Sequence, residues 1–149
     1  MRFGDEGVQA MEWVYATLTA SQELADALGV PLEGLGDRVW PDPAPSGTPT
    51  PFVVYSASEA LDVPAFGPAP RIHSTVPLTV KGIDQARGYD ALAPVARALY
   101  AALVSRVGDG LADGGTMLTA SRVGTVQYPE VGDGIEYRHL GHLLSVEID

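Results

Sequence analysis

The stretch RVWPDPAPSGTPTPFVVYS, residues 38–56, decides how the chain enters its sheet. Five prolines fall within residues 41–51, and an apolar run follows at once. Proline lacks a backbone donor and favours extended conformations, whereas the aromatic and β-branched residues of 52–56 predict a strand. We therefore interpret residues 31–51 as an extended crossover anchored by Trp40, with a floppy loop as the alternative.

The composition indicates a single domain and excludes several classes of protein. The chain has 149 residues, no cysteine and a formal net charge of −10. A disulfide framework and a thiolate zinc site are therefore impossible. Only Lys81 among the nine basic residues is a lysine, and the arginines are scattered singly, which argues against a protein that reads DNA from outside. An acidic surface past which DNA slides stays possible, because it repels phosphate.

The N-terminus predicts neither a signal peptide nor a membrane anchor. Asp5 and Glu6 stand where a signal peptide is basic, and no uninterrupted apolar run follows them. No segment approaches the length of a membrane span.

Two helices are expected before the crossover. Residues 8–18 carry apolar side chains at helical spacing. Thr19 is a candidate N-cap for the second helix, with Gln22 at capping-box spacing, and Gly29 is its candidate stop. We expect Trp13 in the core or at its edge. The first stripe comprises Val8, Met11, Val14 or Tyr15, and Leu18.

A long arm and a second strand are expected after the first strand. Residues 57–71 form a proline-containing loop with three apolar residues that no periodic pattern would bury. These are Leu61, Val63 and Phe66. Residues 72–84 then read as a strand, in which Pro77 indicates an edge position or a bulge.

The second half of the chain predicts one long helix and two long strands. Residues 84–106 carry apolar residues at intervals of three and four. This helix either begins near Asp84 and kinks at Pro94, which we favour, or is capped by Asp90 with Pro94 in its first turn. Residues 116–128 and 135–149 are expected as strands. The whole chain, residues 1–149, is thus predicted as one α+β domain of order α-α-β-β-α-β-β, a four-stranded antiparallel sheet with helices packed on one face.

The sequence contains no convincing catalytic or metal-binding pattern, and we expect neither an enzyme nor a cofactor. His139 and His142 form H-x-x-H, but an odd offset in a strand sends the two rings to opposite faces, one on the surface and one toward the core. Asp109 and Asp113 resemble a calcium loop whose other ligand positions are wrong. Nucleotide-binding glycine motifs and a nucleophile elbow are absent. The carboxylates near residue 133 are best explained as a solvated turn.

Three matching segments carry a resemblance to a known family. Residues 36–41 read GDRVWP, residues 44–45 read AP, and residues 51–55 read PFVVY. Together with the element order, they resemble the tail terminator proteins of long-tailed DNA bacteriophages, also called tail completion or tail-to-head joining proteins. The family pattern there is G-R-V-[YW]-P, A-P and P-[YF]-V-V-Y, so Asp37 is a departure.

The resemblance implies a virion structural protein. Six copies would form a ring that terminates the tail tube at the head-proximal end of the tail, after assembly in the host cytoplasm. The implied partners are other copies of the chain, the major tail tube protein, the head connector or adaptor proteins and the tape measure protein, with DNA passing through the lumen without specific binding and no membrane involved. Candidate interface residues are Trp40, Leu61, Val63, Phe66 and Arg71.

Other functions remain open on the sequence alone. A head-closure or head-tail adaptor protein is the nearest alternative. A small non-enzymatic binding or inhibitor module is the next. A small enzyme is the weakest alternative, because the sequence contains no motif that supports it.

Overall fold

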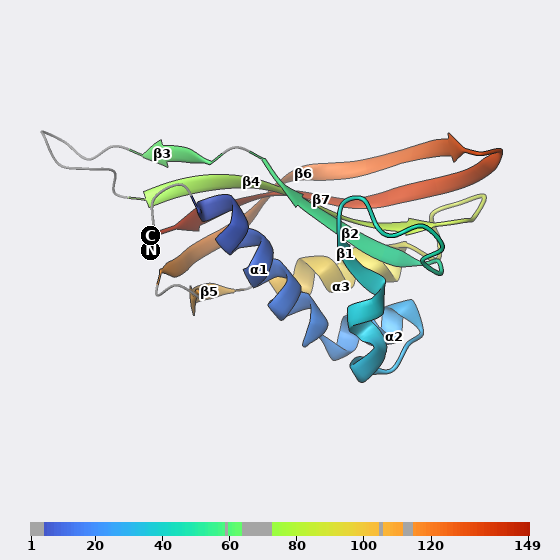
Figure 1. Ribbon diagram of the computed structural model, residues 1–149, viewed down its shortest axis with the longest axis horizontal. Coiled ribbons are helices and arrows are strands. Elements are labelled where there is room, and N and C mark those ends of the chain that lie inside the picture. The colour runs from blue at the N-terminus through green and yellow to red at the C-terminus, as the bar shows by residue number, and fades with distance from the viewer. Residues whose placement is uncertain (1–4, 59, 64–72, 105, 112–114) are drawn as a thin grey trace, which may run out of the picture.

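The computed structural model describes residues 5–58, 60–63, 73–104, 106–111 and 115–149, without the side chains of residues 62, 63 and 73. One curled sheet forms a layer, and all the helices lie against one of its faces (Figure 1). The elements are α1 Glu6–Thr19, α2 Gln22–Leu28, the 3-10 helix η1 Leu32–Arg38, β1 Val39–Pro41, β2 Phe52–Ala57, β3 Leu61–Val63, β4 His73–Asp84, α3 Ala93–Leu103, β5 Val107–Gly110, β6 Thr116–Gly132 and β7 Ile135–Ile148.

The predicted α+β class and the helices on one face are confirmed, but the four-stranded sheet is wrong in detail. The four expected strands are β2, β4, β6 and β7, and every pairing among them is antiparallel. The sheet has seven strands, in the order β1-β2-β4-β7-β6-β5, with β3 paired to β4. The pairing of β1 with β2 is parallel, so the sheet is mixed. The three additional strands have only three or four residues each, too few for a two-residue period to be recognised in the sequence.

The core lies between the helices and the sheet. In α1, Trp13, Val14 and Leu18 are buried, which confirms the expectation for Trp13. The predicted stripe is nevertheless partly wrong, because Val8 and Tyr15 are 57% and 41% exposed. They lie on a second face of the helix, beside β1.

Both ends of α2 follow ordinary capping rules. The N-cap of α2 is Ser21, whose Oγ accepts a hydrogen bond from Leu24 N at 3.2 Å. The expected cap, Thr19, instead donates to the carbonyl of Tyr15 at 2.7 Å. Gly29 stops the helix in the left-handed conformation at φ 72°, as predicted.

The favoured start of the long helix is wrong. Residues up to Asp84 belong to β4, because Asp84 still pairs with Arg138 of β7. The helix begins at Ala93, and Pro94 sits in its first turn, where its missing donor costs nothing. The cap position is Leu92 and not Asp90, with no side-chain capping bond.

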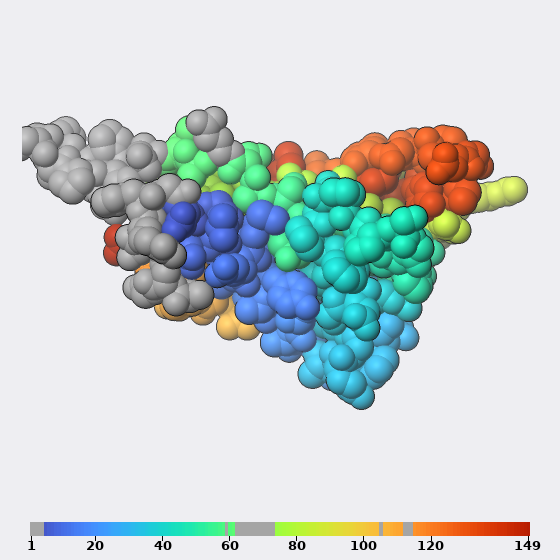
Figure 2. Space-filling view, in the orientation of Figure 1, coloured from blue at the N-terminus to red at the C-terminus, as the bar shows by residue number. Residues whose placement is uncertain are grey.

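The β6–β7 hairpin is longer than predicted and extends past the helices (Figures 1 and 2). The segment expected as its loop, residues 129–134, is strand up to Gly132. Only Asp133 and Gly134 form the turn, and both have positive φ, 50° and 75°. An Asp-Gly pair with this geometry makes the two-residue hairpin turn that matches strand twist.

The predicted crossover of residues 31–51 is ordered, but it is not extended throughout, because Leu32–Arg38 form the 3-10 helix η1. Its anchor also differs from the predicted one. Val39 is fully buried, whereas Trp40 is only half-buried. Arg38 fixes the end of the stretch by donating to the carbonyl of Pro51 at 3.1 Å. Residues 42–51 then pass over the sheet face that the helices leave uncovered.

Candidate functional site

The two predicted interface residues whose side chains the structure describes, Trp40 and Leu61, lie apart. Trp40 lies in β1 at an outer edge of the sheet, and its indole N–H donates to the carbonyl of Asp37 at 3.0 Å. Leu61 lies in β3 and is 60% exposed. Through the pairing register, Trp40 aligns with Lys81 and Leu61 with Thr75, so the two are separated by six residues of β4, or about 20 Å.

The remaining three interface predictions are only partly placed. Val63 pairs with His73 in the β3–β4 ladder, and its side chain is not described. Phe66 and Arg71 lie outside the described residues.

Trp40 does line an apolar groove of about 700 Å³, here called the edge groove. The groove runs between α1 and the β1 edge. Its lining comprises Val8, Met11, Glu12, Tyr15, Gly36, Asp37, Val39, Trp40, Pro41 and Tyr55. Val8 and Tyr15 of α1 lie in one wall of this groove. Residues that the sequence pattern assigned to the core therefore contribute to an exposed surface instead.

The sheet also exposes apolar side chains along its hairpin. Val123 and Val131 of β6 are 70% and 71% exposed, and Val107 of β5 is 74% exposed. Within the described residues, β5 pairs with β6 only as far as Thr119, so the distal part of β6 pairs with β7 alone. An unpaired strand edge with exposed valines is a surface on which another chain can dock.

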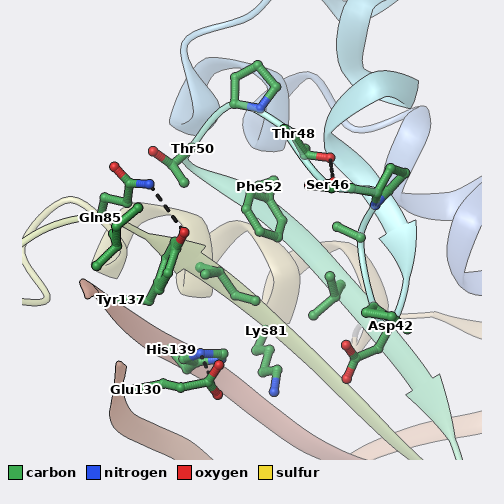
Figure 3. Close-up of a pocket in the computed structure, with 18 of the residues that line it drawn as sticks. Asp42, Ser46, Thr48, Thr50, Phe52, Lys81, Gln85, Glu130, Tyr137 and His139 are labelled. Carbon is green, nitrogen blue, oxygen red and sulfur yellow. Dashed lines mark hydrogen bonds and ion pairs between the residues drawn. The ribbon is translucent and has the colours of Figure 1, made fainter. Parts of the chain in front are cut away.

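A second hollow, the loop cleft, lies between the loop of residues 42–50 and the uncovered sheet face (Figure 3). It has a volume of about 800 Å³. Its floor is formed by β2, β4, β6 and β7, together with Gln85, which directly follows β4. The floor residues are Phe52, Val54, Lys81, Ile83, Gln85, Tyr128, Glu130, Ile135, Tyr137 and His139.

The polar groups of the loop cleft are organised around Lys81. Its Nζ donates to the hydroxyl of Tyr128 at 2.6 Å, and the ring of Tyr128 stacks on His139 with centroids 4.3 Å apart. Glu130 Oε2 lies 3.5 Å from His139 Nε2. At the other end, Gln85 Nε2 lies 3.4 Å from the hydroxyl of Tyr137.

The two histidines point to opposite faces, as predicted, but neither is on the surface. His139 is 5% and His142 6% exposed. His142 Nε2 lies 2.7 Å from the carbonyl of Ala96 on the helix side. His139 lies in the loop cleft, covered by Tyr128. Burial, and next the charge of Lys81, lower the pKa of His139, while Glu130 and Asp42 oppose the shift.

The described residues show no group of three or more His, Asp or Glu side chains arranged to hold a metal ion. Asp109 has a structural role, because its carboxylate accepts a hydrogen bond from Trp13 Nε1 at 2.9 Å. Asp113 lies outside the described part of the chain. In that part, no helix is both long and apolar enough to span a membrane.

Sequence reasoning missed the loop cleft. The sequence singles out Lys81 only as the one lysine among nine basic residues, and no motif marks Tyr128 or Tyr137. The available signal is the two-residue period of the strands, which places Lys81, Tyr128 and His139 on the face opposite to the core. The two-residue period does not indicate that the loop of residues 42–50 covers the sheet face opposite the core.

Comparison with known proteins adds one result. No family model and no curated protein sequence matches the chain. Among solved structures, a chain in the "Virion of native gene transfer agent (GTA) particle" superposes with a TM-score of 0.69 at 18% sequence identity. The match covers 99% of this chain and 98% of that chain. The protein therefore shares the whole fold of a component of that virion.

Proposed function

We propose that this protein is a structural protein of a phage-like virion, in which it forms a ring that ends the tail tube and joins the tail to the head connector. The observation that carries the proposal is the end-to-end likeness to a chain of a gene transfer agent virion, with almost no residue of either chain left over. A match over one entire domain supports a common architecture more strongly than a match to a part of a larger chain.

The exposed surfaces are suited to a repeated contact. The edge groove lies beside the outer strand β1, whereas the exposed valines lie on β5 and β6 at the other side of the sheet. Two different surfaces on opposite edges allow head-to-tail contacts, and these close into a ring when the rotation between copies divides a full turn. Each contact would need to bury on the order of 1,000 Å² or more for a stable ring.

The number of copies and the partners come from the resemblance to tail terminator proteins. It implies six copies, bound on one side to the tail tube protein and on the other to the head connector, with the tape measure protein as a further partner. A net charge of −10 per copy supports a passage for DNA, since acidic walls repel phosphate.

Electron microscopy of the purified protein mixed with isolated tail tubes tests the proposal. Six-membered rings seated on tube ends are the expected result. Binding to isolated head connectors but not to tubes would favour the head-closure adaptor instead. Protein that remains monomeric and binds neither component would favour a separate binding or inhibitor module.

A further inference from the structure

The charge of the edge groove is negative and is not balanced within the described residues. Apolar side chains make up most of its lining, and the charged residues among those described there are Glu12 of α1 and Asp37 of η1. Both are exposed, and neither has an ion-pair partner in the described part of the chain. A complementary surface therefore presents an apolar side chain next to a positive charge.

Such a surface lies at the other edge of the sheet, on β6. The pairing of β6 with β7 shifts between Arg122 and Gly124, so Val123 is an extra residue without a partner in β7. A bulge of this kind redirects a side chain, and Val123 is 70% exposed. Arg122 is also exposed, and its guanidinium lies over the ring of Tyr100 in α3, 5.2 Å from the centroid. We call Arg122 and Val123 the β6 corner.

The charge of the β6 corner is also unpaired. Within the described residues, no carboxylate lies within ion-pair distance of the Arg122 guanidinium. The corner begins the part of β6 that β5 leaves free, because the pairing of β5 with β6 ends at Thr119. One edge of the molecule thus offers an exposed cation and an apolar side chain, and the other edge offers two exposed carboxylates beside an apolar groove.

The edge groove and the β6 corner lie on the same side of the sheet. Arg122 reaches α3, and the groove runs beside α1, so both belong to the side that the helices cover. β1 ends the strand order at one edge, and the free part of β6 lies at the other. Copies placed side by side, with the β6 edge of one next to the β1 edge of the other, bring the two surfaces together.

We propose that the edge groove of one copy receives the β6 corner of a second copy. Val123 packs against the apolar lining, and Arg122 pairs with Glu12 and Asp37. This inference rests on the ring proposed above and names the residues of its repeated contact. Burial of apolar surface supplies most of the affinity, and the exposed ion pairs mainly fix the orientation of the copies. Added salt still strengthens assembly, because the repulsion between copies of charge −10 outweighs these few pairs.

The chain has no cysteine, so single introduced thiols report the contact. Val8→Cys places a thiol in the groove, and Val123→Cys places one at the β6 corner, both at exposed positions where a substitution should not disturb the fold. The two variants are mixed with isolated tail tubes, and also alone at high concentration, and treated with the short thiol cross-linker bismaleimidoethane. Peptide mapping should show pairs that join residue 8 of one copy to residue 123 of another.

Val131→Cys is the matched control for the β6 corner. It is equally exposed on the same strand but lies eight residues farther along, or about 25 Å away, and it should not cross-link to Val8→Cys. Equal cross-linking of Val8→Cys to both β6 positions would overturn the proposal. Pairs that join residue 123 to residue 123 in place of the mixed pairs would also overturn it, because they indicate a two-fold contact.

Charge reversal tests the role of Arg122. Adding Arg122→Glu to the Val123→Cys chain should raise the concentration needed for half-maximal cross-linking at least about tenfold. Arg87→Glu in the same chain changes the net charge equally, at an exposed position in the β4–α3 loop, and should raise it about twofold or less. Glu12→Arg in the Val8→Cys chain should recover most of the loss caused by Arg122→Glu. Equal effects of the two arginine variants, or no recovery, would contradict the assigned pairing.

Electron microscopy of the cross-linked samples separates this inference from the ring proposal. Rings on tube ends without links between residues 8 and 123 would overturn the pairing and leave the ring proposal standing. Links between residues 8 and 123 in samples that contain no rings would support the pairing and count against the ring. Copies that do not associate under either condition would overturn both.

Discussion

Lys81 of β4 and Tyr128 of β6 are joined by a 2.6 Å hydrogen bond, although β7 lies between their two strands. The residue of β7 opposite Lys81 is Gly141. A Cβ atom on Gly141 would overlap the backbone of Val80 and Lys81, so only glycine allows β4 and β7 to approach this closely. The hydrogen bond across the sheet thus depends on a residue that contributes no side chain.

This relationship predicts that Gly141→Ala strongly destabilises the protein. The added methyl group meets backbone atoms that cannot move without shifting a strand, and overpacking of this kind costs about 1–3 kcal/mol or more. Gly124→Ala is the matched control in β6, since its Cβ would make only an ordinary contact with Leu143 at 3.7 Å. Urea unfolding of both variants measures the difference. Equal midpoints for the two would show that β4 and β7 are not so close.

Acidification should destabilise the fold through His139. Its pKa is lowered in the folded state, first by burial and then by Lys81. The unfolded chain then binds more protons, so stability is complete above the unfolded pKa of about 6.5 and is lost as the pH falls from there toward the folded pKa. His139→Gln should flatten this pH dependence, measured as the free energy of unfolding between about pH 7.5 and 5.

A control for that titration comes from Glu130, which favours the protonated ring. Glu130→Gln should make the loss of stability on acidification steeper. A natural chain whose stability is flat across this range would mean that His139 is solvated in solution.

Two leucines of different burial should separate folding from assembly. Leu99 is fully buried in α3, and Leu61 is 60% exposed in β3. Leu99→Ala should cost about 2–5 kcal/mol of stability, because it leaves a cavity. Leu61→Ala should change the stability of the single chain by about 0.5 kcal/mol or less and weaken association. Thermal unfolding and sedimentation velocity together measure both effects. A large loss of stability in Leu61→Ala would place this residue in the core instead.

Ring assembly should strengthen as salt is added. Copies with a charge of −10 repel one another, and the screening length shortens from about 10 Å at 0.1 M salt to about 3 Å at 1 M. Mass photometry across this range should show a growing share of rings on added tube ends. Rings that dissociate with salt would indicate that opposite charges hold the interface together.

The sequence allowed the layer arrangement to be predicted because its long elements carry strong periods. Residues 135–149 largely alternate and residues 93–103 repeat at three and four, so the class and the covered face could be read from them. Residues 52–56 are a continuous apolar run, which predicts a strand but not its covered face. The short strands could not, since β1 ends in Pro41 and β5 reads VGDG, both typical of turns. Their pairing is imposed by neighbouring strands, not by local preference.

The candidate site was less predictable than the fold. Val8 and Tyr15 have the spacing of core residues but lie at the edge groove, because the helix buries a face rotated by about one residue. His139 is buried because Tyr128, its partner in the β6–β7 ladder, stacks on it. Such contacts depend on register and loop placement, which a single sequence does not specify.

The most direct test of the ring proposal is to measure tail lengths in electron micrographs of particles assembled without this protein. The proposal predicts tails of irregular length that fail to join heads, with both defects repaired when the natural chain is supplied. Tails of normal and uniform length, joined to heads in its absence, would contradict it.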